Sequence, residues 1–482
     1  MHDETDLDPY DPDLGEPSTM ELELALRPVK PRVFLGESLD LELSLRNRDE
    51  ARRFVADPAP GSHSVRFVAQ DAAGAERPAC GDEEALAARG VPSDPHHEPR
   101  DVELGPGEER RSVYDLLPRA GELPAGMWTI RAELPGELAE VEAAVEVTAP
   151  PPTPLLARET WEYDQGADSF GLCAWSTSEG EHAGTYLRVR AREDLARTLA
   201  NRRLSERVAE RGLRVAPAAT YRARRRHVLW EDGDLTRVVV VDDELPLAEH
   251  ELPGGALGAW TVADGGLVLV RAEDGELWLE RPALEDPAAG WRLSLGAAPD
   301  GLAPGSGVLS GWASCFGTLW LAAMGRGGGP LLLAGARVSG GARELLPRHE
   351  LRLGGEPRWL SARRGPADEE GEQAQVHALL RADSGHAALW RWVPDVDPEL
   401  LAEGELPVGE LRDALLARRL WLLLERNDQA ILAALPGVSR HLDSARYAPG
   451  WTQLLRLPLA AGGGLYLRGV EGRRFVFEEL ED

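Results

Sequence analysis

The pattern that decides the fold is clearest in residues 267–279, which read LVLVRAEDGELWL. An apolar run, Leu267–Val270, is followed by Asp274-Gly275, a dipeptide favoured in tight turns between antiparallel strands. A second apolar run, Leu277–Leu279, comes directly after the turn. The segment therefore predicts a β-hairpin.

The same arrangement occurs seven times beyond residue 160, in the part of the chain that holds 13 of the 14 tryptophans. The hairpin starts lie 40 to 57 residues apart. This spacing brackets the period of a four-stranded propeller blade, so the repeat predicts a β-propeller over residues 157–482. The hairpins join residues 173–175 to 186–189, 227–230 to 238–241, 267–270 to 277–279, 319–321 to 331–333, 376–380 to 389–392, 420–423 to 431–432, and 465–467 to 475–477.

Further strands fit around these pairs. Segments that begin at Trp260, Trp312, Trp359 and Trp451 precede hairpins, where inner strands belong, and residues 291–295 and 349–353 follow hairpins as outer strands would. The last hairpin is followed by no further strand, so we expect residues 159–163 to complete the last blade and close the ring. Seven blades are favoured, with six or eight as alternatives, and a run of unrelated hairpins is the alternative to a ring.

This part of the chain looks like a β-propeller protein. It lacks the Gly-His…Trp-Asp signature of WD repeats and the double glycine of kelch repeats, so the resemblance names no propeller family. Residues 192–212 break the period, because they are rich in helix formers and end at Gly212. They predict one helical insertion on the first blade, either packed on the propeller or displayed as a partner-binding helix.

The N-terminal part alternates apolar and polar residues with a period of two. Residues 20–26, 39–45 and 127–134 show the pattern most clearly, and about seven short strands with turn signals between them fit into residues 18–149. This picture predicts an all-β sandwich of the immunoglobulin-like (Ig-like) class.

Three segments of this sandwich resemble bacterial Ig-like domains of the intracellular proteinase-inhibitor type. They are Gly36–Leu39 before a strand that ends at Asn47, Leu104–Glu108, and Leu123–Arg131. The resemblance implies the fold and raises protease inhibition as an expectation.

Two segments flank the sandwich. Residues 1–17 carry seven carboxylates and no lysine or arginine, which predicts a disordered acidic tail, either a solubilising tail or a docking peptide. Residues 149–154 contain four prolines, and we predict a proline-rich linker over residues 150–156.

Composition limits the partners. The net charge of −29 disfavours nucleic acid and anionic lipid and favours basic protein partners. The N-terminus lacks the features of a signal peptide, and no apolar run approaches the roughly 20 residues of a spanning helix. Of the 53 basic residues only Lys30 is a lysine, a bias typical of GC-rich bacterial genomes. A bacterial cytoplasmic protein without membrane insertion is therefore expected.

Several single residues and short runs are considered as metal, phosphate or catalytic sites, and each has a simpler structural interpretation. His96-His97 lie beside Asp94 and Glu98, but zinc requires ligands at defined spacings. The acidic run 242–244 is interpreted as a solvated turn, and Gly325–Gly329 as a hairpin loop that opens no helix. Trp390 and Trp392 share one face of a strand and are expected to pack between blades. The basic run Arg222, Arg224, Arg225 and Arg226 is expected to pair with nearby carboxylates, with contact to an anion or an acidic partner as the alternative. Neither disulfide nor metal-ligand spacing is formed by Cys80, Cys173 and Cys315, and no paired motif is formed by His63, His182, His227, His250, His349, His377, His386 and His441.

No catalytic motif is found, so the sequence assigns no catalytic, cofactor-binding or metal-binding residue and predicts no cofactor. The favoured function is a non-enzymatic protein-interaction or scaffold module that binds partners through propeller-face loops and sandwich loops, such as residues 78–100. The alternatives are a propeller hydrolase or lyase with its site at the central channel, and a protease inhibitor that acts through the Ig-like domain. Oligomeric state is not predicted.

Overall fold

The structure is a computed structural model in which the chain divides into two compact units, Met1–Ala149 and Pro150–Asp482. It describes residues 22–58, 65–78, 101–116, 123–134, 139–148, 152–162, 170–190, 198–218, 225–242, 245–284, 289–302, 308–314, 317–326, 329–338, 343–364, 374–382, 386–437, 439–457, 464–471 and 473–480. The predicted acidic tail, residues 1–17, lies outside these ranges.

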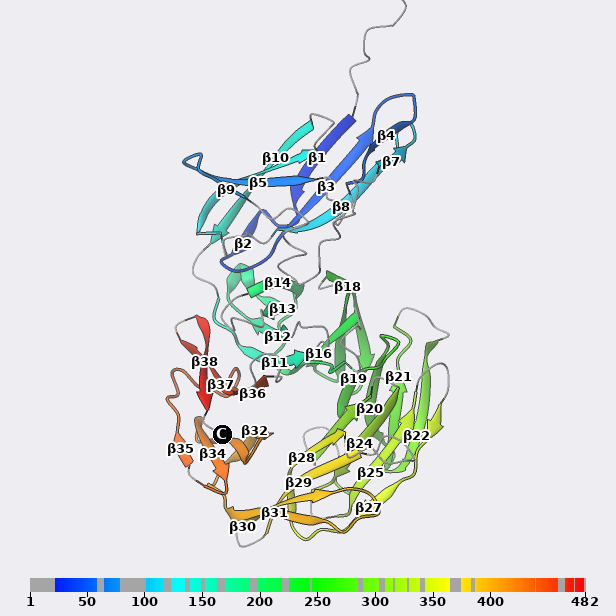
Figure 1. The fold of residues 1–482 in the computed structure, drawn as a ribbon, viewed down its shortest axis with the longest axis vertical. Coiled ribbons are helices and arrows are strands. Elements are labelled where there is room, and N and C mark those ends of the chain that lie inside the picture. The colour runs from blue at the N-terminus through cyan, green and yellow to red at the C-terminus, as the bar shows by residue number, and fades with distance from the viewer. Residues whose placement is uncertain are drawn as a thin grey trace, which may run out of the picture. The chain divides into compact units, whose positions relative to one another are not determined.

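The first unit is built from two main sheets and a short two-stranded one (Figure 1). One sheet contains β1 (Leu22–Pro28), β3 (Leu39–Asn47) and β8 (Glu109–Leu116) in that order. The second contains β2 (Arg32–Phe34), β10 (Ala139–Thr148), β9 (Gly126–Leu134), β5 (Arg66–Asp71) and β6 (Glu76–Pro78). The small sheet pairs β4 (Arg53–Ala56) with β7 (Asp101–Leu104).

The sandwich core is formed by the alternate residues that the sequence pattern identifies. Leu39, Leu41, Leu43 and Leu45 are buried in β3, while the polar residues between them are half-buried. They belong to one apolar cluster with Trp128, Ile130 and Val145 of the other main sheet. The period-two pattern therefore marks the faces of the two sheets that pack together. The finer Ig-like assignment stays a prediction.

The second unit is a β-propeller of seven consecutive sheets (Figure 1). The first three blades are β11 (Leu156–Glu162), β12 (Phe170–Thr177), β13 (Gly184–Arg190) and β14 (Thr198–Ser205); β15 (Arg211–Val215), β16 (Arg225–Asp232), β17 (Leu235–Asp242) and β18 (Leu245–Pro253); and β19 (Gly258–Thr261), β20 (Leu267–Glu273), β21 (Glu276–Arg281) and β22 (Trp291–Ala297).

The other four blades follow in the same order. They are β23 (Val308–Ala313), β24 (Thr318–Met324) and β25 (Leu331–Arg337), with both β26 (Glu344–Leu345) and β27 (His349–Leu351) paired to β25; β28 (Glu356–Arg364), β29 (Ala374–Arg381), β30 (His386–Trp392) and β31 (Glu399–Glu405); β32 (Glu410–Leu416), β33 (Leu420–Arg426), β34 (Gln429–Leu435) and β35 (Ser439–His441); and β36 (Gln453–Leu457), β37 (Gly464–Glu471) and β38 (Arg474–Leu480).

The blades stack face to face around the ring. Separate apolar clusters join the second blade to the third, the third to the fourth, the fourth to the fifth, the fifth to the sixth, and the sixth to the seventh. The central strands carry this packing, as in β24, where every residue is buried. All seven predicted hairpins are present, and the prediction of seven blades is confirmed.

The predicted closure of the ring is wrong. Residues 159–162 do not complete the last blade, because β11 pairs along its whole length with β12, from Leu156 opposite Ser176 to Glu162 opposite Phe170. Among the described residues, the last blade has three strands. The ring closes where the inner strands β11 and β36 lie side by side, and there Ala157 N donates to Gly450 O at 3.0 Å.

The predicted helical insertion at residues 192–212 is also wrong. Residues 191–197 lie outside the described ranges, and the rest of the segment contains β14 and the start of β15. Strand pairing with β13 and β16 overrides the local helix propensity. Gly212 has φ +66° where the register between β15 and β16 shifts, so it serves a bulge rather than a helix end.

The described part of the predicted linker, residues 152–156, is bonded to the first blade, because Thr153 N donates to Glu179 Oε1 and Leu155 N donates to Ser176 O. No helix within the described ranges is long and apolar enough to span a membrane.

Candidate binding sites on the propeller

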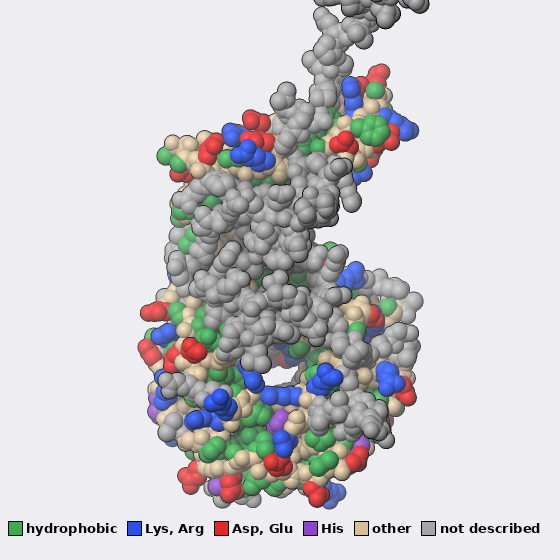
Figure 2. Space-filling model, viewed as in Figure 1, with side chains coloured by type: hydrophobic (Ala, Val, Ile, Leu, Met, Phe, Trp, Pro, Cys, Tyr) green, Lys and Arg blue, Asp and Glu red, His purple; other side chains and the backbone are tan. Residues whose placement is uncertain are grey.

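A basic rim lies where three consecutive inner strands end. We define this rim as Arg363 of β28, Arg456 of β36 and His377 of β29, together with the carbonyl of Leu416 at the end of β32. Arg363 Nη2 donates to Leu416 O at 3.2 Å, and Arg456 Nη1 donates to the same oxygen at 3.3 Å. Two guanidinium groups from different blades thus meet at one acceptor. Figure 2 shows basic side chains around an opening in the ring.

The sheet register places His377 on the same side of the fifth blade as Arg363. His377 lies opposite Ser361 in the β28–β29 pairing, so both side chains point to one face of the sheet. Arg363 is two residues after Ser361 and therefore shares that face, and its Nε donates to Ser361 Oγ at 3.1 Å. Leu416 belongs to the next blade, so this is the face of the fifth blade that looks toward the sixth.

At the rim, burial and neighbouring positive charges disfavour the protonated forms of Arg363 and His377. Burial and the nearby charge of Arg456 lower the pKa of Arg363. Burial, with the charges of Arg363 and Arg391, lowers the pKa of His377 to about 4, so this imidazole is neutral near pH 7. His377 is 6% exposed, and its Nδ1 has no hydrogen-bond partner among the described residues.

A small pocket lies on the boundary between the fifth and sixth blades, at the other end of β28. Arg363 of the rim lies five positions after Arg358 of the pocket in β28, which corresponds to about 17 Å along the strand. The pocket is lined by Arg358, Leu379, Arg381, Leu406, Pro407, Gly409, Leu411 and Leu424.

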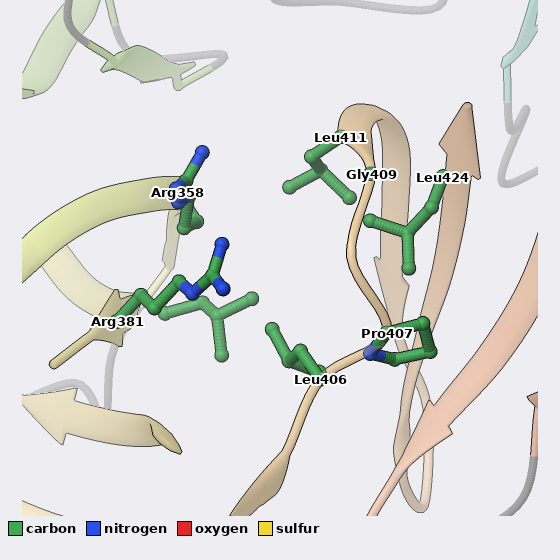
Figure 3. A pocket seen from close by; sticks show the side chains of 8 residues that line it. Arg358, Arg381, Leu406, Pro407, Gly409, Leu411 and Leu424 are labelled. Atoms are coloured by element: carbon green, nitrogen blue, oxygen red, sulfur yellow. The ribbon is translucent and has the colours of Figure 1, made fainter. Parts of the chain in front are cut away.

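Figure 3 shows how charge and apolar surface face each other in this pocket. Arg358 and Arg381 come from β28 and β29 on one side, and Leu406, Pro407 and Leu411 lie on the other. The space open to the centre of a water molecule is about 10 Å³, room for a single water. The pocket therefore fits one inserted group and does not enclose an organic molecule.

The loop that forms the apolar wall also presents a hydrophobic side chain outward. Val408 lies between the lining residues Pro407 and Gly409 and is 60% exposed. On the arginine side, Arg358 pairs with Glu356 at 2.9 Å, while its Nε is buried and has no partner within the described part of the chain. The pocket and Val408 thus combine a cationic side, an apolar wall and an exposed apolar contact.

The structure separates the candidate residues that the sequence analysis weighed. His96-His97, Cys80 and Cys315 lie outside the described ranges, as do Arg222 and Arg224 of the basic run. Arg226 is buried at the start of β16, and Cys173 is a free, buried cysteine on the inner side of the first blade. Trp392 is buried and packs in the cluster between the fourth and fifth blades, with Trp390 against it, as expected for blade packing.

Two other candidates are partly described. Asp242 ends β17 opposite Arg225, and the other two residues of the acidic run, 243–244, lie outside the described ranges. Gly325 and Gly329 lie between the paired strands β24 and β25, as predicted, while residues 327–328 lie outside the described ranges. Within the described ranges, no group of three or more His, Cys, Asp or Glu side chains is placed to hold a metal ion.

Sequence reasoning did not identify the rim or the pocket. Arg363 and His377 come from two strands of the fifth blade and Arg456 from the seventh, so no local sequence pattern connects the three residues. An arginine in the penultimate position of an inner strand is the signal that could have drawn attention to Arg363 and Arg456.

Comparisons with known proteins show only distant likenesses. No family model matches the chain, and no curated protein matches it. Among solved structures, the SapL1 lectin in complex with alpha methyl fucoside is 10% identical, with a TM-score of 0.36 over 60% of this chain and 95% of that one. BBS1N in complex with ARL6DN is 10% identical, with a TM-score of 0.36 over 68% and 92%.

A third match, the beta-glucosidase from Listeria innocua, is 16% identical with a TM-score of 0.17 and covers 27% of this chain. The chain spans only 16% of the length of that enzyme. All three TM-scores are below 0.5, so these likenesses carry no argument about function.

Proposed function

We propose that the chain is a non-enzymatic binding protein, a protein-interaction or scaffold module of a bacterial cytoplasmic assembly, whose propeller holds a partner protein at the boundary between the fifth and sixth blades. The observation that carries this proposal is the pocket of Figure 3. Its two arginines face an apolar wall of leucines and proline, and Val408 is exposed beside it.

The size of the pocket favours a protein partner over a small-molecule substrate. Room for about one water cannot bury a metabolite, whereas one side chain of a partner can insert while the surrounding surface makes further contacts. An apolar side chain next to a carboxylate suits this site, because guanidinium groups bind carboxylates and the leucines cover the apolar part.

The ring gives the site a rigid base. The pocket is formed by strands β28, β29, β32 and β33 and by the short connection between β31 and β32. Each of these strands is paired within its sheet, and β29 and β33 are paired on both sides. A site built on paired strands keeps its shape without the partner, which lowers the entropic cost of binding.

The test compares affinity capture from a lysate of the native host by three forms of the full chain. The first is the wild type, the second carries Arg381→Glu with Val408→Asp, and the control carries Arg426→Glu, a change at an exposed arginine at the end of β33. We expect at least one protein to be retained by the wild type and the control and depleted about tenfold or more by the pocket variant. Equal recovery of every captured protein by the pocket variant would refute the proposal.

A further inference from the structure

We infer that the rim of Arg363, Arg456 and His377 is a second site, distinct from the pocket, and that it binds an oxyanion, either a carboxylate of an acidic peptide or a phosphate. The convergence of the two guanidinium groups on the single carbonyl of Leu416 is the first observation. A carbonyl oxygen bears no net charge, so it leaves both cations without charge compensation.

Several arginines of the neighbouring strands are compensated by carboxylates, whereas no described carboxylate compensates the two rim arginines. Arg391 pairs with Glu399, Arg412 pairs with Glu425, and Arg358 pairs with Glu356. Within the described ranges, neither Arg363 nor Arg456 has a carboxylate within ion-pair distance. In a chain with 82 acidic and 53 basic residues, acidic partners are abundant, yet the described residues supply none at this position.

His377 provides the second, independent observation. Its imidazole is more than nine-tenths buried on the face of the sheet that carries Arg363, and its Nδ1 makes no hydrogen bond to a described residue. An unmade hydrogen bond at a buried polar atom is costly, and a bound group would remove that cost. With the proton on Nδ1, the neutral imidazole can donate to the same anion as the two arginines.

The geometry suits an oxyanion better than other ligands. Guanidinium groups present planar sets of N–H donors that match carboxylate and phosphate oxygens, and charge-assisted hydrogen bonds of this kind are the stronger ones in proteins. A cation would be repelled by both arginines. A neutral apolar ligand would offer no acceptor to the N–H groups of the guanidinium and imidazole side chains. The rim thus selects for negative charge and oxygen acceptors.

The test is isothermal titration calorimetry of the full chain in a buffer without phosphate. Inorganic phosphate and a tetraglutamate peptide are the two probes, and they distinguish a phosphate ligand from a carboxylate one. We expect at least one probe to bind with a dissociation constant of about 1 mM or lower. Arg363→Gln with Arg456→Gln should weaken that binding at least about tenfold, whereas Arg426→Gln should leave it unchanged.

A second readout covers the case in which the double variant does not fold. In the wild type, the imidazole NMR signal of His377, assigned by its loss in His377→Gln, should shift on addition of the binding probe. Absence of binding by both probes, equal binding by the double variant, or an unshifted His377 signal would overturn the inference.

A third variant tests whether this chain itself supplies the anion. Asp368, Glu369 and Glu370 lie in the sequence between β28 and β29, outside the described ranges. If binding occurs only after these residues are changed to Asn or Gln, the occupant is the chain's own acidic segment, and the inference of an external ligand is wrong. Binding by the wild type and by this variant alike supports it.

Discussion

Arg468 donates from Nη1 to Glu159 Oε2 at 2.9 Å, and both side chains are fully buried although 309 positions separate them in the sequence. Glu159 is in β11 of the first blade and Arg468 is in β37 of the last. Arg468 also donates from Nη2 to Ala157 O at 2.9 Å and to Trp451 O at 3.0 Å. One side chain therefore joins the two blades at which the ring closes.

A third charge completes this closure cluster. Arg190 Nε lies 3.2 Å from Glu159 Oε1, with both side chains buried, so one carboxylate faces two guanidinium groups. The side-chain amide of Gln453 adds two bonds across the same seam, from Nε2 to Glu159 O and from Glu159 N to Oε1, each 2.8 Å long. The ring is thus closed by buried polar contacts where the last blade lacks a fourth described strand.

The first prediction concerns this cluster. Glu159→Gln removes the buried carboxylate charge that faces the guanidinium groups of Arg190 and Arg468, so it should lower the free energy of unfolding of the propeller by about 3–5 kcal/mol. Urea unfolding followed by tryptophan fluorescence measures this, because 13 of the 14 tryptophans are in the propeller. The control is Glu273→Gln, which removes the exposed pair with Arg292 and should change the value by less than about 1 kcal/mol. Equal effects of the two substitutions would contradict the closure role.

The second prediction is that acid weakens the propeller through its buried histidines. Burial, with the charges of Arg225 and Arg226, lowers the pKa of His227 to about 4, and burial with Arg363 lowers the pKa of His377 to about 4. Because the unfolded chain takes up these protons more readily, the contribution is fully present above about pH 6.5 and is lost as the pH falls toward 4.

His227 allows this pH dependence to be isolated. His227→Asn should remove about 3 kcal/mol of the stability difference between pH 7 and pH 4 relative to the wild type. The measurement is the free energy of urea unfolding at several pH values in phosphate-free buffer. The account is wrong on this point if the wild type and the variant lose the same stability over that range.

The third prediction concerns the contact between the third and fourth blades. Trp260 of β19 packs against Gly311 of β23, where an added Cβ would lie 2.3 Å from the tryptophan ring and 2.8 Å from Leu321. Gly311→Ala should therefore destabilise the propeller by about 1–3 kcal/mol through overpacking. Gly354→Ala is the matched control, since an added Cβ there meets no atom within 4 Å. Thermal unfolding monitored by circular dichroism compares the two variants.

The fourth prediction is that the two units fold independently. The apolar cluster of the sandwich contains only residues of the first unit, and the clusters between blades contain only residues of the second. A fragment of residues 18–149 should give a β-type circular dichroism spectrum and a cooperative unfolding transition, reported by its one tryptophan, Trp128. A fragment without cooperative unfolding would show that the sandwich depends on the rest of the chain.

The hairpins were predictable because the residues at their turns, Gly, Asn and Asp, are themselves typical of tight turns. Asp274 and Gly275 have φ values of +52° and +78°, and Asn427 and Asp428 have +51° and +59°. These are conformations that Gly, Asn and Asp adopt most readily, so the turn positions can be read from the sequence. The apolar runs beside them are the buried central strands, as in β20 and β33.

The outer strand β14 could not be predicted from local pattern, because it buries polar residues. Asn201 is fully buried and accepts a hydrogen bond from Trp175 Nε1 at 2.9 Å, and Arg202 next to it is 3% exposed. A strand that buries such residues shows no apolar–polar alternation, so its helix-forming residues dominate a sequence-based interpretation. Pairing with β13 decides the structure, and this partner is not visible within the segment.

The closure and the rim depend on residues brought together only by the ring. The Glu159–Arg468 pair and the convergence of Arg363 and Arg456 on Leu416 O join strands from different blades. No spacing rule connects such positions, because their proximity follows from the number and order of the blades. Composition even points away from a basic site, since the net charge is −29.

Residue-resolved amide hydrogen exchange at the inner edge of β11 tests the closed ring most directly. Ala157 N donates to Gly450 O and Glu159 N donates to Gln453 Oε1, so both amides are bonded across the seam rather than within the first blade. The closed ring predicts that they exchange as slowly as amides of the central strand β12. Exchange of Ala157 and Glu159 at the rate of an unprotected strand edge, with β12 still protected, would show that the first and last blades do not meet.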